Sequence, residues 1–201
     1  GLPIFIFGHS MGSFVTQRFV QLYGPKVKGV VLCGSAKQPN MLLNMGIFLS
    51  RLIIGFRGRR HRSKLLDKMS FGAYNKHFTP NRTSFDWLNR DEEEVDKYIN
   101  DEYCGGIFTA AYFKDFLKGL KTINSNFELV PKELPIFIMS GSKDPVGGPV
   151  ELVTKLYNRY RDLEIRDLEF KLYPDARHEL LLEENKDEVI NDVLIWLKSR
   201  I

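Results

Sequence analysis

Cysteine is scarce in this sequence. The two that are present, Cys33 and Cys104, lie far apart, and neither stands near a histidine at the spacing of metal ligands. This pattern disfavours both a disulfide framework and a zinc site. So few cysteines also fit a reducing compartment, and we therefore expect a cytoplasmic protein without bound metal.

Long hydrophobic runs and a strong charge of one sign are also missing. The first apolar run, residues 4–7, is too short for the core of a signal peptide or for a membrane span. The net charge of +4 argues for nucleic acid or membrane only if a local cluster supports it. With 201 residues, 43% of residues apolar and 27% charged, the composition is that of a globular protein with a substantial core.

The order of predicted elements indicates an α/β fold. Apolar runs predict short buried strands, and apolar residues at helical spacing predict the helices between them. The strands are expected at residues 4–7, 27–32, 135–139 and 168–173, and the helices at 11–23, 149–161 and 185–200. This alternation is typical of a mostly parallel sheet flanked by helices.

Residues 36–131 interrupt the alternation, because no strand is convincing there. Helical patterns are expected instead at 42–56, 85–100 and 108–123. We therefore divide the chain into a first core part, a helical insertion and a second core part. The three parts are residues 1–35, 36–131 and 132–201.

The sequence Gly8-His9-Ser10-Met11-Gly12 fits the Gly-x-Ser-x-Gly motif between the first strand and the first helix. In that context the serine lies on a strained, tight turn, and small residues two before and two after it avoid clashes. Ser10 is then a candidate nucleophile, and the Met11 amide at the helix N-terminus is a candidate oxyanion donor. A glycine-rich turn with a capping serine is the alternative.

A serine nucleophile needs a base, and the base needs a group that orients it. Asp144 follows the strand at 135–139, and His178 follows the last strand, so both are expected at the edge where Ser10 lies. The order is therefore Ser10, Asp144, His178. For Asp144 the alternative is an Asp-Pro turn in which the carboxylate accepts a backbone hydrogen bond.

Other residues compete for these roles less well. His9 stands beside the nucleophile and is expected to point elsewhere, while His61 lies in an arginine cluster and His77 in the insertion. Asp175 is a rival acid that does not directly follow a strand, and we expect Glu179 to be solvated or to support the site indirectly.

With these motifs the chain resembles the α/β-hydrolase superfamily, and within it the lysophospholipase and monoacylglycerol lipase group, related to serine aminopeptidase-like hydrolases. The resemblance rests on residues 8–12, 141–147 and 176–179, and residues 85–105 are similar to the cap of that group. It implies ester hydrolysis through an acyl-enzyme, with Ser10 as nucleophile, His178 as base and then acid, and Asp144 orienting His178. It also implies that no cofactor takes part.

That family has further strands before the nucleophile strand and a second oxyanion donor in that earlier region, and this sequence contains neither. We therefore expect the chain to be a carboxyl-terminal portion of a longer protein, or the product of a truncated reading frame. Loss of one oxyanion donor lowers turnover by about 100-fold to 1000-fold. The expected activity of these 201 residues is accordingly weak or absent, and their first strand is left with an unpaired edge.

The substrate is expected to be a lipid or another small ester, bound in an apolar groove beneath the cap. The candidate groove residues, each of which also suits a plain core position, are Phe48, Phe71, Tyr74, Phe78, Trp87, Phe108 and Tyr112. A non-catalytic interaction protein of the same fold is the alternative, and peptidase and thioesterase activities stay open.

Within residues 41–64, the apolar stretch 41–56 is followed by five basic side chains at 57–64, which form the one basic cluster. We expect the apolar stretch to pack on the hydrolase body and the arginines to be offset by the acidic run at 91–96. Peripheral contact with an anionic membrane surface is the alternative. Nucleic acid is not an expected partner, because no aromatic residues alternate with the basic ones.

Overall fold

A computed structural model describes residues 1–148 and 150–201 of the chain. Its centre is a parallel sheet with the strand order β1-β2-β3-β4. The strands are β1 (Phe5–His9), β2 (Gly29–Cys33), β3 (Ile136–Gly141) and β4 (Leu168–Tyr173). The α/β class and all four expected strands are confirmed, with shifts of one or two residues at most ends.

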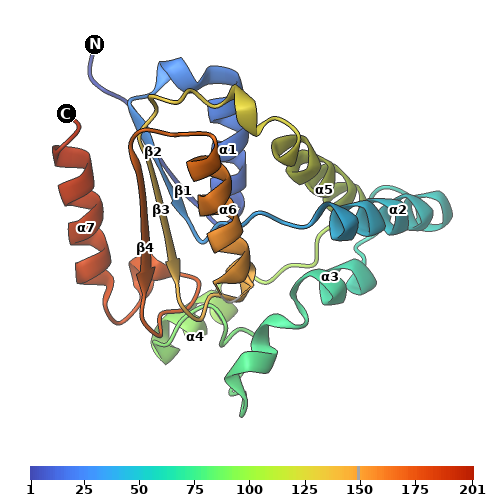
Figure 1. Cartoon of the computed structure of the whole chain (residues 1–201). Helices are drawn as coiled ribbons and strands as arrows, with labels where there is room; N and C mark the ends of the chain where they lie inside the picture. Colours follow the sequence, from blue (N-terminus) through green and yellow to red (C-terminus); the bar gives the residue numbers. More distant parts are fainter. Residues whose placement is uncertain (149) are drawn as a thin grey trace.

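The two faces of the sheet are covered by different helices (Figure 1). Val30 and Leu32 of β2 pack in one core with α1 (Met11–Tyr23) and α6 (Glu151–Asp162). The alternate residues Val31 and Cys33 pack in a second core with α7 (Lys186–Lys198). Side chains of a strand point to opposite faces in turn, so a strand buried on both faces is apolar throughout.

The three helices that flank the sheet lie where the sequence predicts them. The helix expected from 149 to 161 is α6, which begins at Glu151, and Pro149 lies outside the described residues. None of the helices in the described part of the chain is long and apolar enough to span a membrane.

Residues 36–131, called the helical segment below, contain four α-helices, two short 3-10 helices (Tyr74–Phe78 and Phe127–Leu129) and no strand of the described sheet. The α-helices are α2 (Asn40–Arg57), α3 (Lys64–Phe71), α4 (Glu92–Asn100) and α5 (Ala110–Asn124). Helices α2 and α5 approach closely, since a Cβ on Gly46 would come within 2.6 Å of Leu117. Helix α4 lies at the carboxyl ends of the strands (Figure 1). The domain boundaries at 35 and 131 stay a prediction.

The helix expected at 85–100 is wrong in its first half, and the eight-residue α3 was not expected. Only Glu92–Asn100 is helical. The Asp86 carboxylate accepts hydrogen bonds from the backbone amides of Arg82 and Thr83 at 2.7 and 3.0 Å, which holds this stretch in turns. Asp91 then caps α4 by accepting from the amide of Glu93 at 2.9 Å.

Strand β1 lies at one edge of the described sheet. Apolar side chains near this edge are solvent-exposed, including Ile4 at 59% and Val15 of α1 at 60%. An unpaired strand beside exposed apolar groups is a surface that pairs readily with other chains. The expected open edge of the first strand is therefore present in the structure.

Candidate active site

Ser10 lies on the turn that joins β1 to α1, as the motif predicts. Its backbone has φ 52° and ψ −121°, a conformation that is rare for a residue with a side chain. Strain of this kind typically costs about 1–3 kcal/mol and persists only where the surrounding structure enforces it. Here the Ser10 amide donates to the carbonyl of Cys33 at 3.0 Å, which ties the turn to the end of β2.

The two motif glycines differ in how crowded they are. A Cβ on Gly8 would lie 2.7 Å from the carbonyl oxygen of Gly12 and 2.5 Å from Thr16 Oγ1, so only glycine fits there. A Cβ on Gly12 would meet no atom within 4 Å apart from its chain neighbours and the backbone of its own helix. The steric reason expected for Gly12 is therefore wrong in this structure. Gly8 is the glycine at which strand β1 and helix α1 come too close for a side chain.

Met11 is the first residue of α1. Amides in the first turn of a helix have no partner within the helix, and they favour negative charge. The Met11 amide is thus suited to an oxyanion. Its side chain reaches the helical segment, because Tyr112 donates its hydroxyl to Met11 Sδ at 3.1 Å.

Asp144 and His178 meet at the carboxyl edge of the sheet. His178 Nδ1 lies 2.9 Å from Asp144 Oδ2, and both side chains are buried, at 2% and 0% exposure. The other carboxylate oxygen of Asp144 accepts from the amide of Val146 at 2.9 Å. Asp144 therefore makes the Asp-Pro turn and holds the histidine at once, so the two readings of this residue do not exclude each other.

The His178 ring lies between aromatic side chains. Its centroid is 4.8 Å from that of His9 and 5.2 Å from that of Trp87. Ser10 directly follows His9 in the chain, which brings the serine turn beside the histidine. Among the described residues the Ser10 hydroxyl and His178 form no hydrogen bond, so Ser10 is adjacent to the Asp144–His178 pair without being bonded to it.

His9 does not point away from the site, contrary to the sequence expectation. Its Nε2 atom lies 3.1 Å from the His178 carbonyl oxygen and can donate to it when neutral. Burial, followed by the charge of His178, lowers the pKa of His9 from 6.5 to about 4. His9 therefore stays neutral near pH 7, and its Nε2–H tautomer is the one that makes this hydrogen bond.

Gly34 is a site residue that the sequence reasoning missed. It follows β2 with φ +58°, and a Cβ there would lie 2.9 Å from His178 Cε1 and 3.4 Å from Asp144 Oδ2. The absence of a side chain makes room for the histidine–carboxylate pair. Its place directly after a buried strand is the signal that could have identified it.

The rival groups are placed differently. Asp175 is exposed, and its amide donates to Ser142 Oγ at 2.8 Å. Glu179 is half-buried; burial raises the pKa of its carboxyl above the ordinary value, and the neighbouring His178 opposes this shift. His61 and His77 belong to the helical segment, and His77 is exposed.

Some of the expected groove residues form an aromatic row that ends at His178. Phe71 packs against Tyr74 at 5.9 Å, Tyr74 against Trp87 at 5.0 Å, and Trp87 against the His178 ring. Phe108 and Tyr112 stack on each other at 4.1 Å, and Tyr112 also contacts Met11. Phe48 is exposed on α2 and Phe78 lies under the Arg177 guanidinium, so neither belongs to this row.

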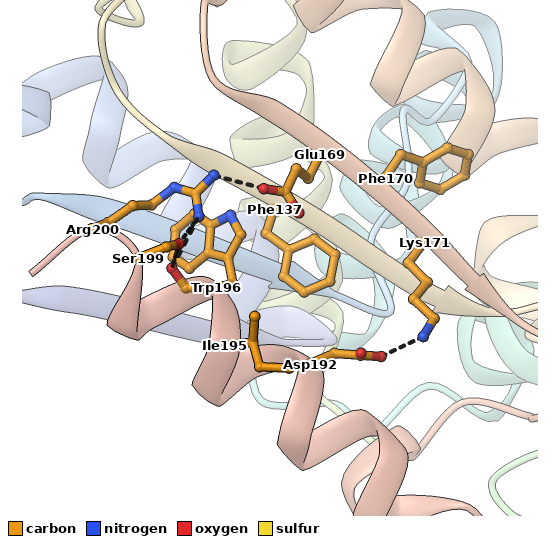
Figure 2. A pocket seen from close by; sticks show the side chains of 9 residues that line it. All are labelled: Phe137, Glu169, Phe170, Lys171, Asp192, Ile195, Trp196, Ser199 and Arg200. Atoms are coloured by element: carbon orange, nitrogen blue, oxygen red, sulfur yellow. Dashed lines mark hydrogen bonds and ion pairs between the residues drawn. The ribbon is translucent and has the colours of Figure 1, made fainter.

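A surface hollow of about 330 Å³ lies elsewhere, where β3 and β4 face α7. Figure 2 shows its charged side chains, and they are paired: Lys171 with Asp192 at 2.5 Å, and Arg200 with Glu169 at 2.6 Å. Neither Asp144 nor His178 lines it. Within residues 1–148 and 150–201, no group of three or more His, Cys, Asp or Glu side chains is arranged to hold a metal ion.

A parallel sheet with helices on both faces, a serine on a strained strand–helix turn and a buried Asp–His pair define the α/β-hydrolase class. The sequence pattern of the serine aminopeptidase S33 family matches residues 1–185, and the chain belongs to this family.

Comparison with individual proteins agrees with this class. A carboxyl esterase from Bacillus coagulans, solved with glycerol, superposes with a TM-score of 0.89 at 25% identity over 99% of this chain and 65% of that one. A soluble variant of monoglyceride lipase from Saccharomyces cerevisiae, solved with a substrate analogue, gives a TM-score of 0.71 at 22% identity over 100% of this chain and 63% of that one.

Among curated relatives, a Schizosaccharomyces pombe protein provisionally named a monoglyceride lipase is 26% identical over 98% of this chain and 48% of its own length. The chain thus spans about half of this relative and about two thirds of the two solved proteins.

The unequal crowding of the two motif glycines predicts unequal effects of one added methyl group. Gly8→Ala should lower the free energy of unfolding by about 1–3 kcal/mol, because backbone and Thr16 must move to admit the Cβ. Gly12→Ala should be neutral or stabilising by up to about 1 kcal/mol, since alanine suits a helix better than glycine. Urea unfolding of the two variants measures both, and equal losses would contradict the prediction.

The lowered pKa of His9 predicts a pH-dependent loss of stability. The unfolded histidine binds a proton near pH 6.5 and the folded one only near pH 4. The contribution of His9 to the free energy of unfolding is therefore complete above pH 6.5 and is lost as the pH falls toward 4. His9→Gln removes the titrating group and keeps a side-chain N–H that can donate to the His178 carbonyl.

The loss of unfolding free energy between pH 7 and pH 5 should therefore be smaller in His9→Gln than in the unaltered protein, by on the order of 1 kcal/mol. His77→Gln, at an exposed histidine, is the matched control and should leave the loss unchanged. The prediction fails if the two variants behave alike.

Proposed function

We propose that this chain carries the catalytic groups of a serine hydrolase that cleaves carboxylic esters of lipids, such as monoacylglycerol or lysophospholipid. Ser10 is the nucleophile, His178 the base, and Asp144 the residue that orients His178. The observation that carries the proposal is the buried hydrogen bond between His178 Nδ1 and Asp144 Oδ2, 2.9 Å long, beside the strained Ser10 turn.

In this mechanism Asp144 holds the Nδ1–H tautomer of His178, which leaves Nε2 to accept a proton. Ser10 Oγ attacks the ester carbonyl while its proton passes to His178 Nε2. The Met11 amide donates to the oxyanion of the tetrahedral intermediate. His178 then gives the proton to the leaving alcohol, and a water, deprotonated by His178 in turn, releases the fatty acid from the Ser10 ester.

Two observations favour a lipid ester over other acyl groups. The aromatic row from Phe71 to Trp87 gives the surroundings of His178 an apolar character, which suits an acyl chain. The relatives are named as a carboxyl esterase and monoglyceride lipases. Peptidase activity, which the family's description suggests, and thioesterase activity are the alternatives within the same mechanism.

Covalent labelling tests the triad directly. A fluorophosphonate probe should label Ser10, Ser10→Ala should abolish labelling, and His178→Ala should slow it by roughly 1000-fold or more, because the base is lost. Ser199→Ala, at a serine just after α7, is the control that should label normally. Mass spectrometry of the labelled peptide identifies the site.

A folded sample that takes no label would favour the non-catalytic alternative. In a labelled sample, comparison of a monoacylglycerol, an acyl thioester and a dipeptide separates the substrate classes. The weak turnover expected of these 201 residues stays a prediction that the same assays measure, and so does the cytoplasmic location.

We also propose that residues 41–64 contact an anionic membrane surface. Helix α2 buries Leu43 and Ile47, but six of its apolar side chains stay exposed, so the expected packing of this stretch on the body is only half realised. The exposed six are Met41, Leu42, Met45, Phe48, Leu52 and Phe56. Phe56, the most exposed of them at 85%, stands directly before the basic cluster.

The charges around α2 support the same contact. The acidic run at 91–96 does not offset the arginines of 57–64 as expected, because Asp96 and Glu92 pair with Arg82 at 2.8 and 3.5 Å. A hollow of about 480 Å³ beside α2 is lined by Arg51, Lys118 and Lys121, with no carboxylate among its described lining residues. Basic side chains next to exposed apolar groups suit a surface of anionic lipid.

Charge reversal should weaken this contact. The triple variant Arg59→Glu, Arg60→Glu, Arg62→Glu is expected to lower binding to phosphatidylserine vesicles by roughly 100-fold, at about 1 kcal/mol for each basic residue. The matched control reverses Lys26, Lys28 and Lys198, three exposed lysines outside the cluster. Vesicle co-sedimentation decides, and equal binding of the two triple variants would refute the membrane contact.

A further inference from the structure

Glu183 is a fully buried carboxylate that the proposed mechanism does not use. It lies between the short turn Leu180–Leu182 and helix α7, and its side chain has 0% exposure. Taking a carboxylate out of water is unfavourable unless donors replace the lost hydration. The positions of those donors indicate what the residue does.

Four N–H groups surround the carboxylate. One oxygen accepts from the amide of Arg177 at 2.7 Å and from the amide of Arg90 at 3.2 Å. The other accepts from Arg90 Nε at 2.7 Å and from the amide of Glu184 at 3.2 Å. Glu183 thus binds the residue directly before His178 and, at the same time, an arginine of the helical segment.

The chain around His178 depends on such contacts, because residues 174–179 form neither helix nor strand. The amide of Glu179, directly after His178, donates to the Leu88 carbonyl at 2.9 Å. The Arg177 guanidinium donates in turn to the Asn89 carbonyl at 2.8 Å and to the Asp86 carbonyl. Residues on both sides of His178 are therefore held by residues 86–90, and Trp87 of the same stretch packs on the His178 ring.

We propose that Glu183 is a positioning residue for His178, and that its ion pair with Arg90 couples residues 86–90 of the helical segment to the loop that carries the histidine. The position of residues 86–90 then sets the orientation of the His178 ring toward Asp144. The proposal rests on the proposed function only in giving His178 the role of base, since the geometric coupling exists whether or not the protein turns over an ester.

The test follows the proton between His178 and Asp144. A histidine Nδ1 proton donated to a buried carboxylate resonates well downfield of the backbone amides in proton NMR, and His178→Ala assigns the signal by removing it. In Glu183→Gln the new amide group cannot accept from all four donors. The signal should be lost or broadened, and fluorophosphonate labelling of Ser10 should slow by at least about tenfold.

Glu188→Gln is the matched control, because it removes the same charge from an exposed ion pair with Lys171, 2.8 Å long, in the nearby helix α7. It should leave both the signal and the labelling rate unchanged. Arg90→Met should reproduce the Glu183→Gln result through the other partner of the pair. Circular dichroism confirms that each variant is folded.

A folded Glu183→Gln protein with the signal and labelling rate of the unaltered protein would overturn the proposal, since the pair would then serve stability alone. If Glu183→Gln does not fold, Arg90→Met replaces it, because it removes the cation of the pair and leaves Glu183 in place; an unchanged signal in a folded Arg90→Met protein overturns the proposal equally. An unaltered protein that shows the signal but takes no label would contradict the proposed function and leave the positioning role to be decided by the NMR signals alone.

Discussion

The candidate site depends on the parallel pairing of the four strands. Parallel strands end at the same edge of their sheet, so the residues that follow them meet even when they are far apart in the chain. Each strand contributes one group: Ser10 follows β1, Gly34 follows β2, Asp144 follows β3 and His178 follows β4. A change in strand order or direction would separate the serine from the Asp–His pair.

Two energetically unfavourable features, a strained backbone and a buried carboxylate, lie at this edge of the sheet, and neighbouring contacts compensate for them. The strained Ser10 backbone is held by the Cys33 carbonyl, and the buried Asp144 carboxylate is satisfied by His178 and by the amide of Val146. The helical segment takes part as well, because Leu88 binds the loop next to His178 and Trp87 covers its ring. The helical segment thus contributes residues to the candidate site.

Much of this arrangement could be predicted from local patterns. Buried strands, the glycine-flanked serine and polar residues placed directly after strands are features of a few consecutive residues each, which is why the positions of Ser10, Asp144 and His178 follow from the sequence. The bond from His9 to the His178 carbonyl and the pair of Arg90 with Glu183 could not be predicted this way. They join residues distant in the chain, and no spacing rule connects them.

The sequence by itself determined the α/β class, the strand–turn–helix around Ser10 and the order of the three candidate catalytic residues, because each depends on local periodicity and turn chemistry. Only the tertiary structure decided which side of α2 is buried, which carboxylates pair with which arginines, and that Gly8 rather than Gly12 is crowded. These depend on which surfaces approach one another in space, and a helix with apolar residues on several faces does not specify its own partner.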